Sequence, residues 1–188
     1  MTPPELEEYK ALRDTIRERG TARVWVFVVG IGLWAALAVT MTAVGAAPAS
    51  TLVPLLVIAS SFEAVFALHV GVERVGRYLQ TNFDDEWEKA AMAFGRPSGA
   101  ATVDPLFVAP FLTAALLNLL PALIAGPTAP ELIFVGGGSA LFILRVLVAR
   151  HAAKRQRAVD LERFQQMRRD NVQRQSAQST QSTQSAQS

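Results

Sequence analysis

Val24 to Val44 reads VWVFVVGIGLWAALAVTMTAV, and Pro105 to Pro130 reads PLFVAPFLTAALLNLLPALIAGPTAP. These two stretches decide the fold, because they run for 21 and 26 residues without a charged side chain. A bilayer core about 30 Å thick is crossed by roughly 20 apolar residues of α-helix. Each stretch therefore predicts one membrane-spanning helix, over residues 24–44 and 105–125.

Two further stretches carry a single Asp, Glu, Lys or Arg residue each. Residues 52–70, LVPLLVIASSFEAVFALHV, contain Glu63, and residues 132–149, LIFVGGGSALFILRVLVA, contain Arg145. With these the sequence predicts an all-α fold: a four-helix transmembrane bundle made of two hairpins, with cytoplasmic helical extensions. The charge distribution excludes a soluble domain. The absence of cysteine excludes disulfides and thiolate chemistry.

The basic residues predict the orientation. Of the 18 Lys and Arg residues, 5 precede the first span, 4 lie between the second and third spans, and 8 follow the fourth, whereas both hairpin connections have none. Positive residues in short loops stay on the cytoplasmic side. We therefore expect a multi-pass protein of the bacterial inner, or cytoplasmic, membrane with both termini inside.

The segments outside the spans predict four cytoplasmic pieces. Residues 1–20 form an amphipathic helix, with a capping box between Thr2 and Glu5 and a C-cap at Gly20. Residues 71–104 form a helical segment and linker, in which Asn82 caps a short helix. Residues 150–174 form a basic helix. Residues 175–188 are a disordered Ser/Gln tail, because this repeat offers no apolar surface to bury.

Charges inside a span are costly and usually have a partner. At 1.5 Å per residue, Glu63 lies about 16 Å and Arg145 about 20 Å from the outer boundary. These similar depths predict an intramembrane ion pair between the second and fourth spans. Asn118 is a polar cavity or interface candidate in the third span. With Pro110 and Pro121 it either bends the helix or frees a carbonyl to line a cavity, or it belongs to a kinked structural helix with one interhelical hydrogen bond.

A second polar group is expected where the helices leave the bilayer. Arg74, Arg77 and Tyr78 are suited to the membrane interface, and this stretch is a predicted docking point for the N-terminal helix. His69, Glu73 and His151 are weak candidates for a metal or proton site, against the simpler interpretation of polar anchoring. No metal, cofactor or catalytic residue is expected, since no catalytic or nucleotide-binding motif is present.

Two sequence motifs are similar to those of a known group of proteins. Residues 9–16 read YKALRDTI, and residues 73–79 read ERVGRYL, followed by Trp87 and Glu88. These motifs resemble those of an uncharacterised family of small bacterial multi-span membrane proteins with a cytosolic leading helix. The resemblance covers about the first half of the chain and implies a fold and a compartment but no activity. Glu63 departs from the family pattern.

These features favour a non-enzymatic structural, regulatory or scaffold component that acts through self-association or a membrane partner. The alternative is an oligomeric ion channel or small-solute transporter that uses Glu63 and Arg145. The expected partners are the lipid bilayer, anionic headgroups at its inner face, and either a second copy or another membrane protein. Nucleic acid is not expected, because the basic helix lacks a clustered face with base-reading residues.

Overall fold

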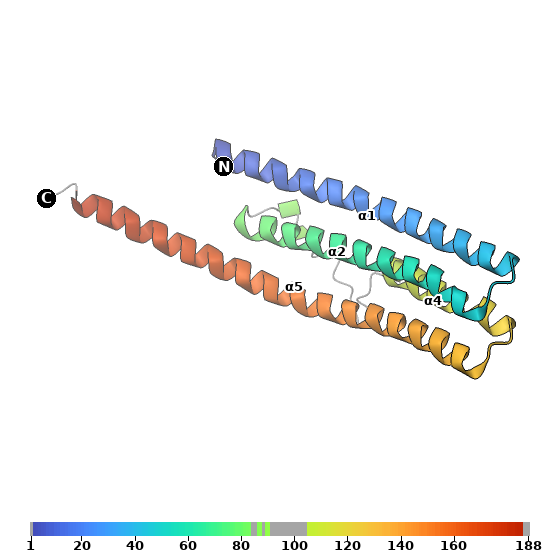
Figure 1. Cartoon of the computed structure of the whole chain (residues 1–188). Coiled ribbons are helices and arrows are strands. Elements are labelled where there is room, and N and C mark those ends of the chain that lie inside the picture. Colours follow the sequence, from blue (N-terminus) through green and yellow to red (C-terminus); the bar gives the residue numbers. More distant parts are fainter. Residues whose placement is uncertain (1, 84–85, 88, 91–104, 186–188) are drawn as a thin grey trace.

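The computed structural model describes residues 2–83, 86–87, 89–90 and 105–185, and these ranges form an all-α helical bundle (Figure 1). The elements are the helices α1 (Pro3–Ala43), α2 (Leu52–Asn82), α4 (Pro105–Ile124) and α5 (Ala129–Ser185), with a short 3-10 helix η1 (Pro48–Thr51) before α2. Within the described ranges, α1, α2 with η1, and α5 are each long and apolar enough to cross a membrane. The apolar helix α4 is shorter. Membrane association is therefore indicated.

The helices form two antiparallel hairpins whose connections lie at the same end of the bundle (Figure 1). Each connection contains a glycine with positive φ, Gly45 at 61° and Gly126 at 69°. Glycine adopts this conformation without the Cβ clash that other residues suffer. Because both connections lie at the same end of the bundle (Figure 1), α2 and α5 run in the same direction. Their side chains can therefore meet along the length of the two helices.

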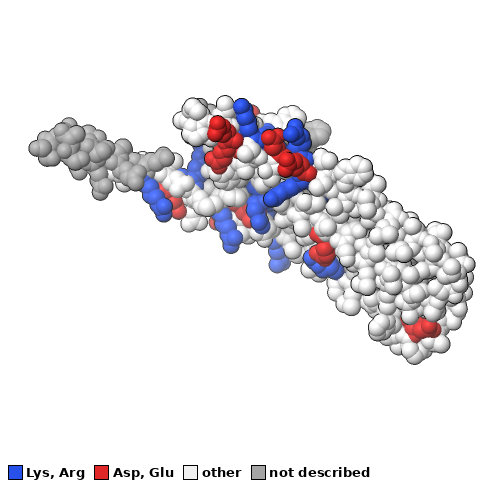
Figure 2. Space-filling model, turned by 45° about the horizontal axis from the view of Figure 1, so that its top comes forward, with Lys and Arg blue, Asp and Glu red and all other residues white. Residues whose placement is uncertain are grey.

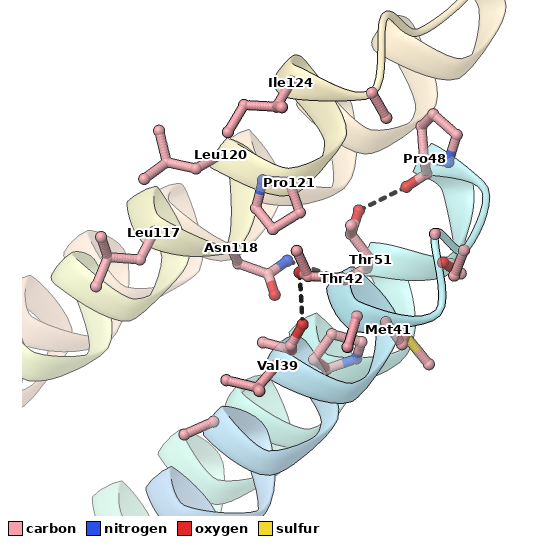
Figure 3. A pocket seen from close by; sticks show the side chains of 18 of the residues that line it. Val39, Met41, Thr42, Pro48, Thr51, Leu117, Asn118, Leu120, Pro121 and Ile124 are labelled. Atoms are coloured by element: carbon pink, nitrogen blue, oxygen red, sulfur yellow. Dashed lines mark hydrogen bonds between the residues drawn. The ribbon is translucent and has the colours of Figure 1, made fainter.

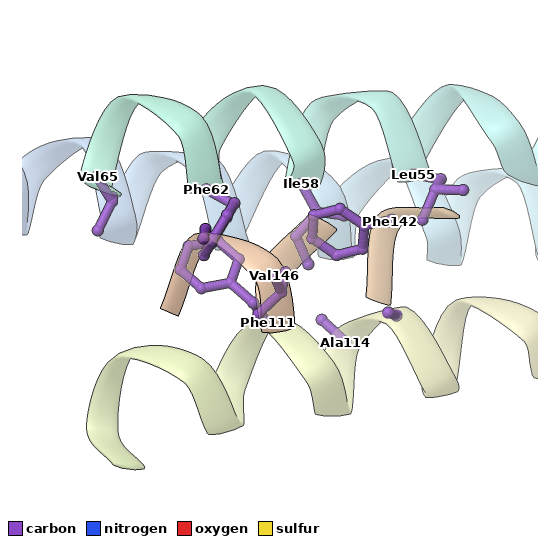
Figure 4. Close-up of a cluster of buried hydrophobic side chains, with 10 residues drawn as sticks. Leu55, Ile58, Phe62, Val65, Phe111, Ala114, Phe142 and Val146 are labelled. Atoms are coloured by element: carbon purple, nitrogen blue, oxygen red, sulfur yellow. The ribbon is translucent and has the colours of Figure 1, made fainter. Parts of the chain in front are cut away.

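The core lies among α2, α4 and α5 (Figure 4). Phe62 of α2 lies at its centre, with its ring centroid 5.3 Å from that of Phe111 and 6.0 Å from that of Phe142, both in edge-on geometry. Such edge contacts are favoured for aromatic pairs. In contrast α1 supplies only partly buried side chains, and its one buried residue is Gly30.

Two glycines allow the helices to approach closely. A Cβ on Gly30 of α1 would overlap the Ser61 hydroxyl of α2, and a Cβ on Gly138 of α5 would lie 2.9 Å from a methyl group of Leu52. Small residues have this role in membrane helix packing. The neighbouring Gly136 and Gly137 of α5 do not share this role, since a Cβ on either has nothing within 4 Å.

The predicted helix end at Gly20 is wrong, because α1 continues through it as one helix of 41 residues. Glycine costs about 1 kcal/mol inside a helix, and packing on both sides of Gly20 offsets this cost. Arg19 lies against Gly71 of α2, and Arg23 contacts His69. The capping bond at the start of α1 is confirmed, since the Thr2 amide donates to Glu5 Oε2 at 2.6 Å.

Two other predictions about elements also need correction. Asn82 is the last residue of α2 rather than the cap of a new helix, and its side-chain amide donates to the Tyr78 carbonyl at 3.3 Å. The Ser/Gln tail continues as helix to Ser185 instead of losing its structure after residue 174. Extending an existing helix avoids the cost of nucleation, so the tail needs no apolar contact to continue. The predicted linker over 96–103 lies outside the described residues.

Candidate functional site

The structure brings Glu63 and Arg145 together, as the depth argument predicts. Arg145 Nη2 donates to Glu63 Oε2 at 2.7 Å, and the guanidinium carbon lies 5.9 Å from the centroid of the Phe66 ring. Each charged side chain is 46% exposed. The pair therefore lies on the outer surface of α2 and α5, and it lines neither the cavity beside Asn118 nor the one beside Gln80 and Arg168.

A second and more deeply buried ion cluster ties α2 to α5 beyond the predicted spans. Arg77, only 4% exposed, donates from Nη2 to Asp160 Oδ2 at 2.9 Å, and Arg74 Nε donates to the same oxygen at 3.3 Å. The other Asp160 oxygen accepts from Gln156 at 3.0 Å. Asp160 is 5% exposed, and the sequence reasoning missed it.

The hydrogen bonds control the charge of Asp160. Burial alone would raise the pKa of this carboxyl, but hydrogen bonds from Arg77, Gln156 and Arg74 together outweigh burial and hold the pKa below its usual range. Asp160 thus stays ionised beside the buried Arg77 guanidinium. Without this partner Arg77 would be a buried charge compensated only by Glu73, at 3.6 Å.

Glu73 joins the ion cluster to α1 and to a further arginine of α5. Arg157 Nε donates to Glu73 Oε2 at 2.9 Å, and Arg77 Nη1 lies 3.6 Å from the same oxygen. His69 Nε2 lies 3.4 Å from Glu73 Oε1, while its Nδ1 lies 2.9 Å from Arg23 Nη1 of α1. The carboxylate therefore contacts arginines of α2 and α5 directly, and His69 links it to Arg23 of α1.

The three residues predicted as weak metal-site candidates do not lie close together. His69 and Glu73 are in contact, but His151 is exposed on α5. Among the described residues no group of three or more His, Asp or Glu side chains could hold a metal ion. His69 and Glu73 therefore lie together without His151.

The N-terminal part of α1 lies against the end of α2, where docking is predicted. Tyr78 donates its hydroxyl proton to Glu8 Oε1 at 2.9 Å, and partial burial together with this bond raises the pKa of the Tyr78 phenol. The Tyr78 ring meets Phe164 of α5 edge-on at 5.6 Å, and Tyr9 meets Phe83 at 5.7 Å. Tyr78 therefore contacts both long helices.

Asn118 forms a hydrogen-bonded group within the bundle. It is 1% exposed, accepts from Trp34 Nε1 at 3.2 Å and donates to the Thr51 carbonyl at 2.9 Å. This group borders a cavity of about 660 Å³ between α1, α4 and the connection that joins α1 to α2 (Figure 3). Asn118 is therefore both an interhelical contact and a cavity residue, the two roles that the sequence suggests for it.

The side-chain contacts between α2 and α5 join residues that are separated by a similar number of positions in the sequence. The partners are 82 residues apart for Glu63 and Arg145, 83 for Arg77 and Asp160, and 84 for Glu73 and Arg157. Because the two helices run in the same direction, the offset changes by only about one helical turn along the interface, to 86 residues for Arg74 and Asp160 and 87 for Thr81 and Arg168. The depth count that pairs Glu63 with Arg145 would therefore also find Asp160 if it continued below the membrane.

Comparison with known proteins gives no match for this chain among family models, curated proteins or solved structures.

Proposed function

We propose that this protein is a non-enzymatic scaffold of the bacterial inner membrane that acts through self-association or through a membrane partner. The resemblance to small uncharacterised bacterial membrane proteins agrees with this role and assigns no chemistry to it. The observation that carries the proposal is the position of the Glu63–Arg145 pair. Two charges that are each 46% exposed lie within apolar helical segments, on the outside of the bundle.

A charged side chain is costly to place in hydrocarbon. Ionisable side chains inside a membrane almost always face protein or a water-filled cavity, because exposure to lipid is expensive. Arg145 and Glu63 neutralise each other within one chain, but about half of each side chain still lacks protein cover. A second protein surface placed over the pair removes this exposure.

Self-association is the geometry that the pair favours. A two-fold interface uses the same surface of both copies, so that residue i meets j and j meets i. A surface that carries both a carboxylate and a guanidinium is self-complementary under this symmetry, since Glu63 of one copy can approach Arg145 of the other. Ser60 lies one turn before Glu63 and is exposed beside it.

The distribution of charge supports the proposed orientation. Figure 2 shows Lys, Arg, Asp and Glu gathered over the half of the bundle that holds the N-terminus, whereas the half with the hairpin connections is almost free of charge. By the positive-inside rule the charged half is cytoplasmic. Basic residues of α5 near the membrane, such as Arg150 and Arg155, are then placed for anionic headgroups.

Disulfide cross-linking tests self-association directly, because the natural chain contains no cysteine. Ser60→Cys, placed beside the ion pair, should give a covalent dimer on oxidation in native membranes. Ile133→Cys is the matched control, since Ile133 is 75% exposed near the start of α5. Equal cross-linking at both positions, or none at Ser60→Cys, would contradict self-association through this surface.

A second candidate, an oligomeric channel or small-solute transporter, has one observation in its favour. Because Glu63 and Arg145 face outward, copies that meet at this surface would place charged side chains along their shared interface. Reconstitution in liposomes with an ion-flux assay distinguishes the two functions. A reproducible flux that Glu63→Gln abolishes would favour the channel, and absence of flux from cross-linkable protein would favour the scaffold.

A further inference from the structure

A cavity of about 660 Å³ lies between α1 and α4, at the end of the bundle that carries the hairpin connections (Figure 3). Apolar side chains of the two helices form its long walls. Residues of the first connection close one end. The residues labelled in Figure 3 are Leu117, Leu120, Pro121 and Ile124 on the α4 wall, Val39, Met41 and Thr42 on the α1 wall, and Pro48 and Thr51 at the closed end.

We infer that this cavity binds one acyl chain of a membrane lipid, which enters sideways between α1 and α4. The volume is within the range of about 300–1,000 Å³ that small-molecule sites occupy. Nineteen residues line the cavity and none of them is charged. Val39 and Ile124 at its walls are 69% and 83% exposed, so that the cavity borders the surface that the hydrocarbon covers.

The polar side chains of the wall already have partners within the chain. Trp34 donates to Asn118, and Asn118 donates to the Thr51 carbonyl. The hydroxyls of the wall each donate to a carbonyl three or four residues earlier, as follows: Thr42 to Ala38, Ser50 to Ala47, and Thr51 to Pro48. A polar ligand would lose its hydration and gain few new hydrogen bonds here. An acyl chain has no polar groups whose hydration could be lost.

The shape of the cavity argues against a helix from a second copy. A helix is about 10–12 Å in diameter and rises 5.4 Å per turn, so that 660 Å³ holds only between about one and one and a half turns. The connection residues Gly45, Ala46 and Pro48 close the cavity in the direction in which a spanning helix would have to continue. A flexible chain can instead enter from the side and end inside.

Trp34 is a natural reporter for this site, because its ring is part of the cavity wall. The chain has three tryptophans. Trp25→Phe and Trp87→Phe together leave Trp34 as the only one. In nanodiscs, phosphatidylcholine brominated on its acyl chains should quench this Trp34. The quenching should persist at about one lipid per protein when excess unbrominated lipid is added.

Two variants of α1 provide the matched comparison. Ala38 lines the cavity, whereas Ala36 is exposed on the same helix and does not. Native mass spectrometry of the full-length protein in mild detergent should show one retained lipid for the wild type and for Ala36→Phe. Ala38→Phe should lose that lipid and, on the single-tryptophan background, lose the persistent quenching.

Three results would overturn the inference. They are a wild type without a retained lipid, an Ala38→Phe protein that retains it as well as Ala36→Phe does, and a retained molecule whose mass is not that of a lipid. If Ala38→Phe does not fold, the wild-type mass and the quenching of Trp34 still decide. The inference requires embedding in the bilayer but not self-association, so that its outcome is separate from that of the cross-linking.

Discussion

At the scale of single residues, the strongest constraint on this molecule is the Arg77–Asp160 pair. Both side chains are about 95% buried, so each has lost its water. Replacing a buried pair with apolar residues often costs little, but removal of one member leaves an uncompensated charge. The pair therefore fixes the position of α5 against α2 more strongly than the exposed pairs do.

Asp160→Ala should lower the free energy of unfolding by about 3 kcal/mol or more, the usual cost of breaking a buried ion pair. Glu73, 3.6 Å from Arg77, moderates this loss but does not replace Asp160. Equilibrium unfolding in mixed micelles measures the change. Asp14→Ala is the control, since its ion pair with Arg17 is mostly exposed and should contribute little. Equal losses for the two variants would contradict the assignment.

The pH dependence of stability provides an independent check on Asp160. The folded pKa of this carboxyl is below its ordinary value of 3.8, so that the unfolded chain binds the proton at a higher pH than the folded chain does. The stability that ionised Asp160 contributes is therefore present above pH 3.8 and is lost as the pH falls through the pKa of the folded protein. The Asp160→Asn protein should lack this part of the acid-induced loss.

The residues that the sequence could and could not predict differ in their surroundings. Glu63 and Arg145 are isolated charges in apolar stretches, so that counting residues from the boundary suffices to pair them. Asp160 is one acid within a helix rich in charges, and nothing in the local pattern distinguishes a buried acid there from an exposed one. Only its register with Arg77 of α2 identifies it.

At the scale of elements, α1 has one point of especially close approach to α2. Gly30 is its only buried residue, and a Cβ at this position would overlap the Ser61 hydroxyl. Gly30→Ala should therefore push α1 away from α2 and destabilise the protein by about 1–3 kcal/mol, the usual cost of overpacking. Thermal unfolding of the purified protein measures this effect.

Gly32→Ala is the matched control for that substitution, because a Cβ at Gly32 has nothing within 4 Å. This control should be neutral or slightly stabilising, since alanine is the better helix former. Ser61→Gly should restore much of the stability that Gly30→Ala removes. Failure of this second substitution to rescue the first would show that the contact does not hold α1.

The elements also show where pattern reasoning succeeds and where it does not. Long apolar runs identify the three helices that are long and apolar enough to cross a membrane, because solvation by lipid leaves few other solutions. Helix ends are harder, since Gly20 and Asn82 have the chemistry of caps while tertiary contacts continue α1 through Gly20 and place Asn82 within α2. The same limit applies to the tail, where composition indicates the absence of a core rather than the absence of a helix.

At the scale of the whole molecule, both termini and the ion clusters should lie on the cytoplasmic side. A cysteine at Ala129, beside a hairpin connection, should react with a membrane-impermeant maleimide on intact cells. A cysteine at Ala177, in the exposed tail, should react only after permeabilisation. The reverse pattern of labelling would invert the proposed topology. The cysteine-free parent chain provides the blank.

The length of α5 has a mechanical consequence. This helix has 57 residues, about 85 Å at 1.5 Å per residue, and it contains no glycine or proline after Gly138. Sharp kinks usually occur at such residues, so a rotation of α5 about its own axis within the bilayer would be transmitted along the helix to Ser185. The faces of the tail would then turn together with the part of α5 near Arg145, without any hinge between them.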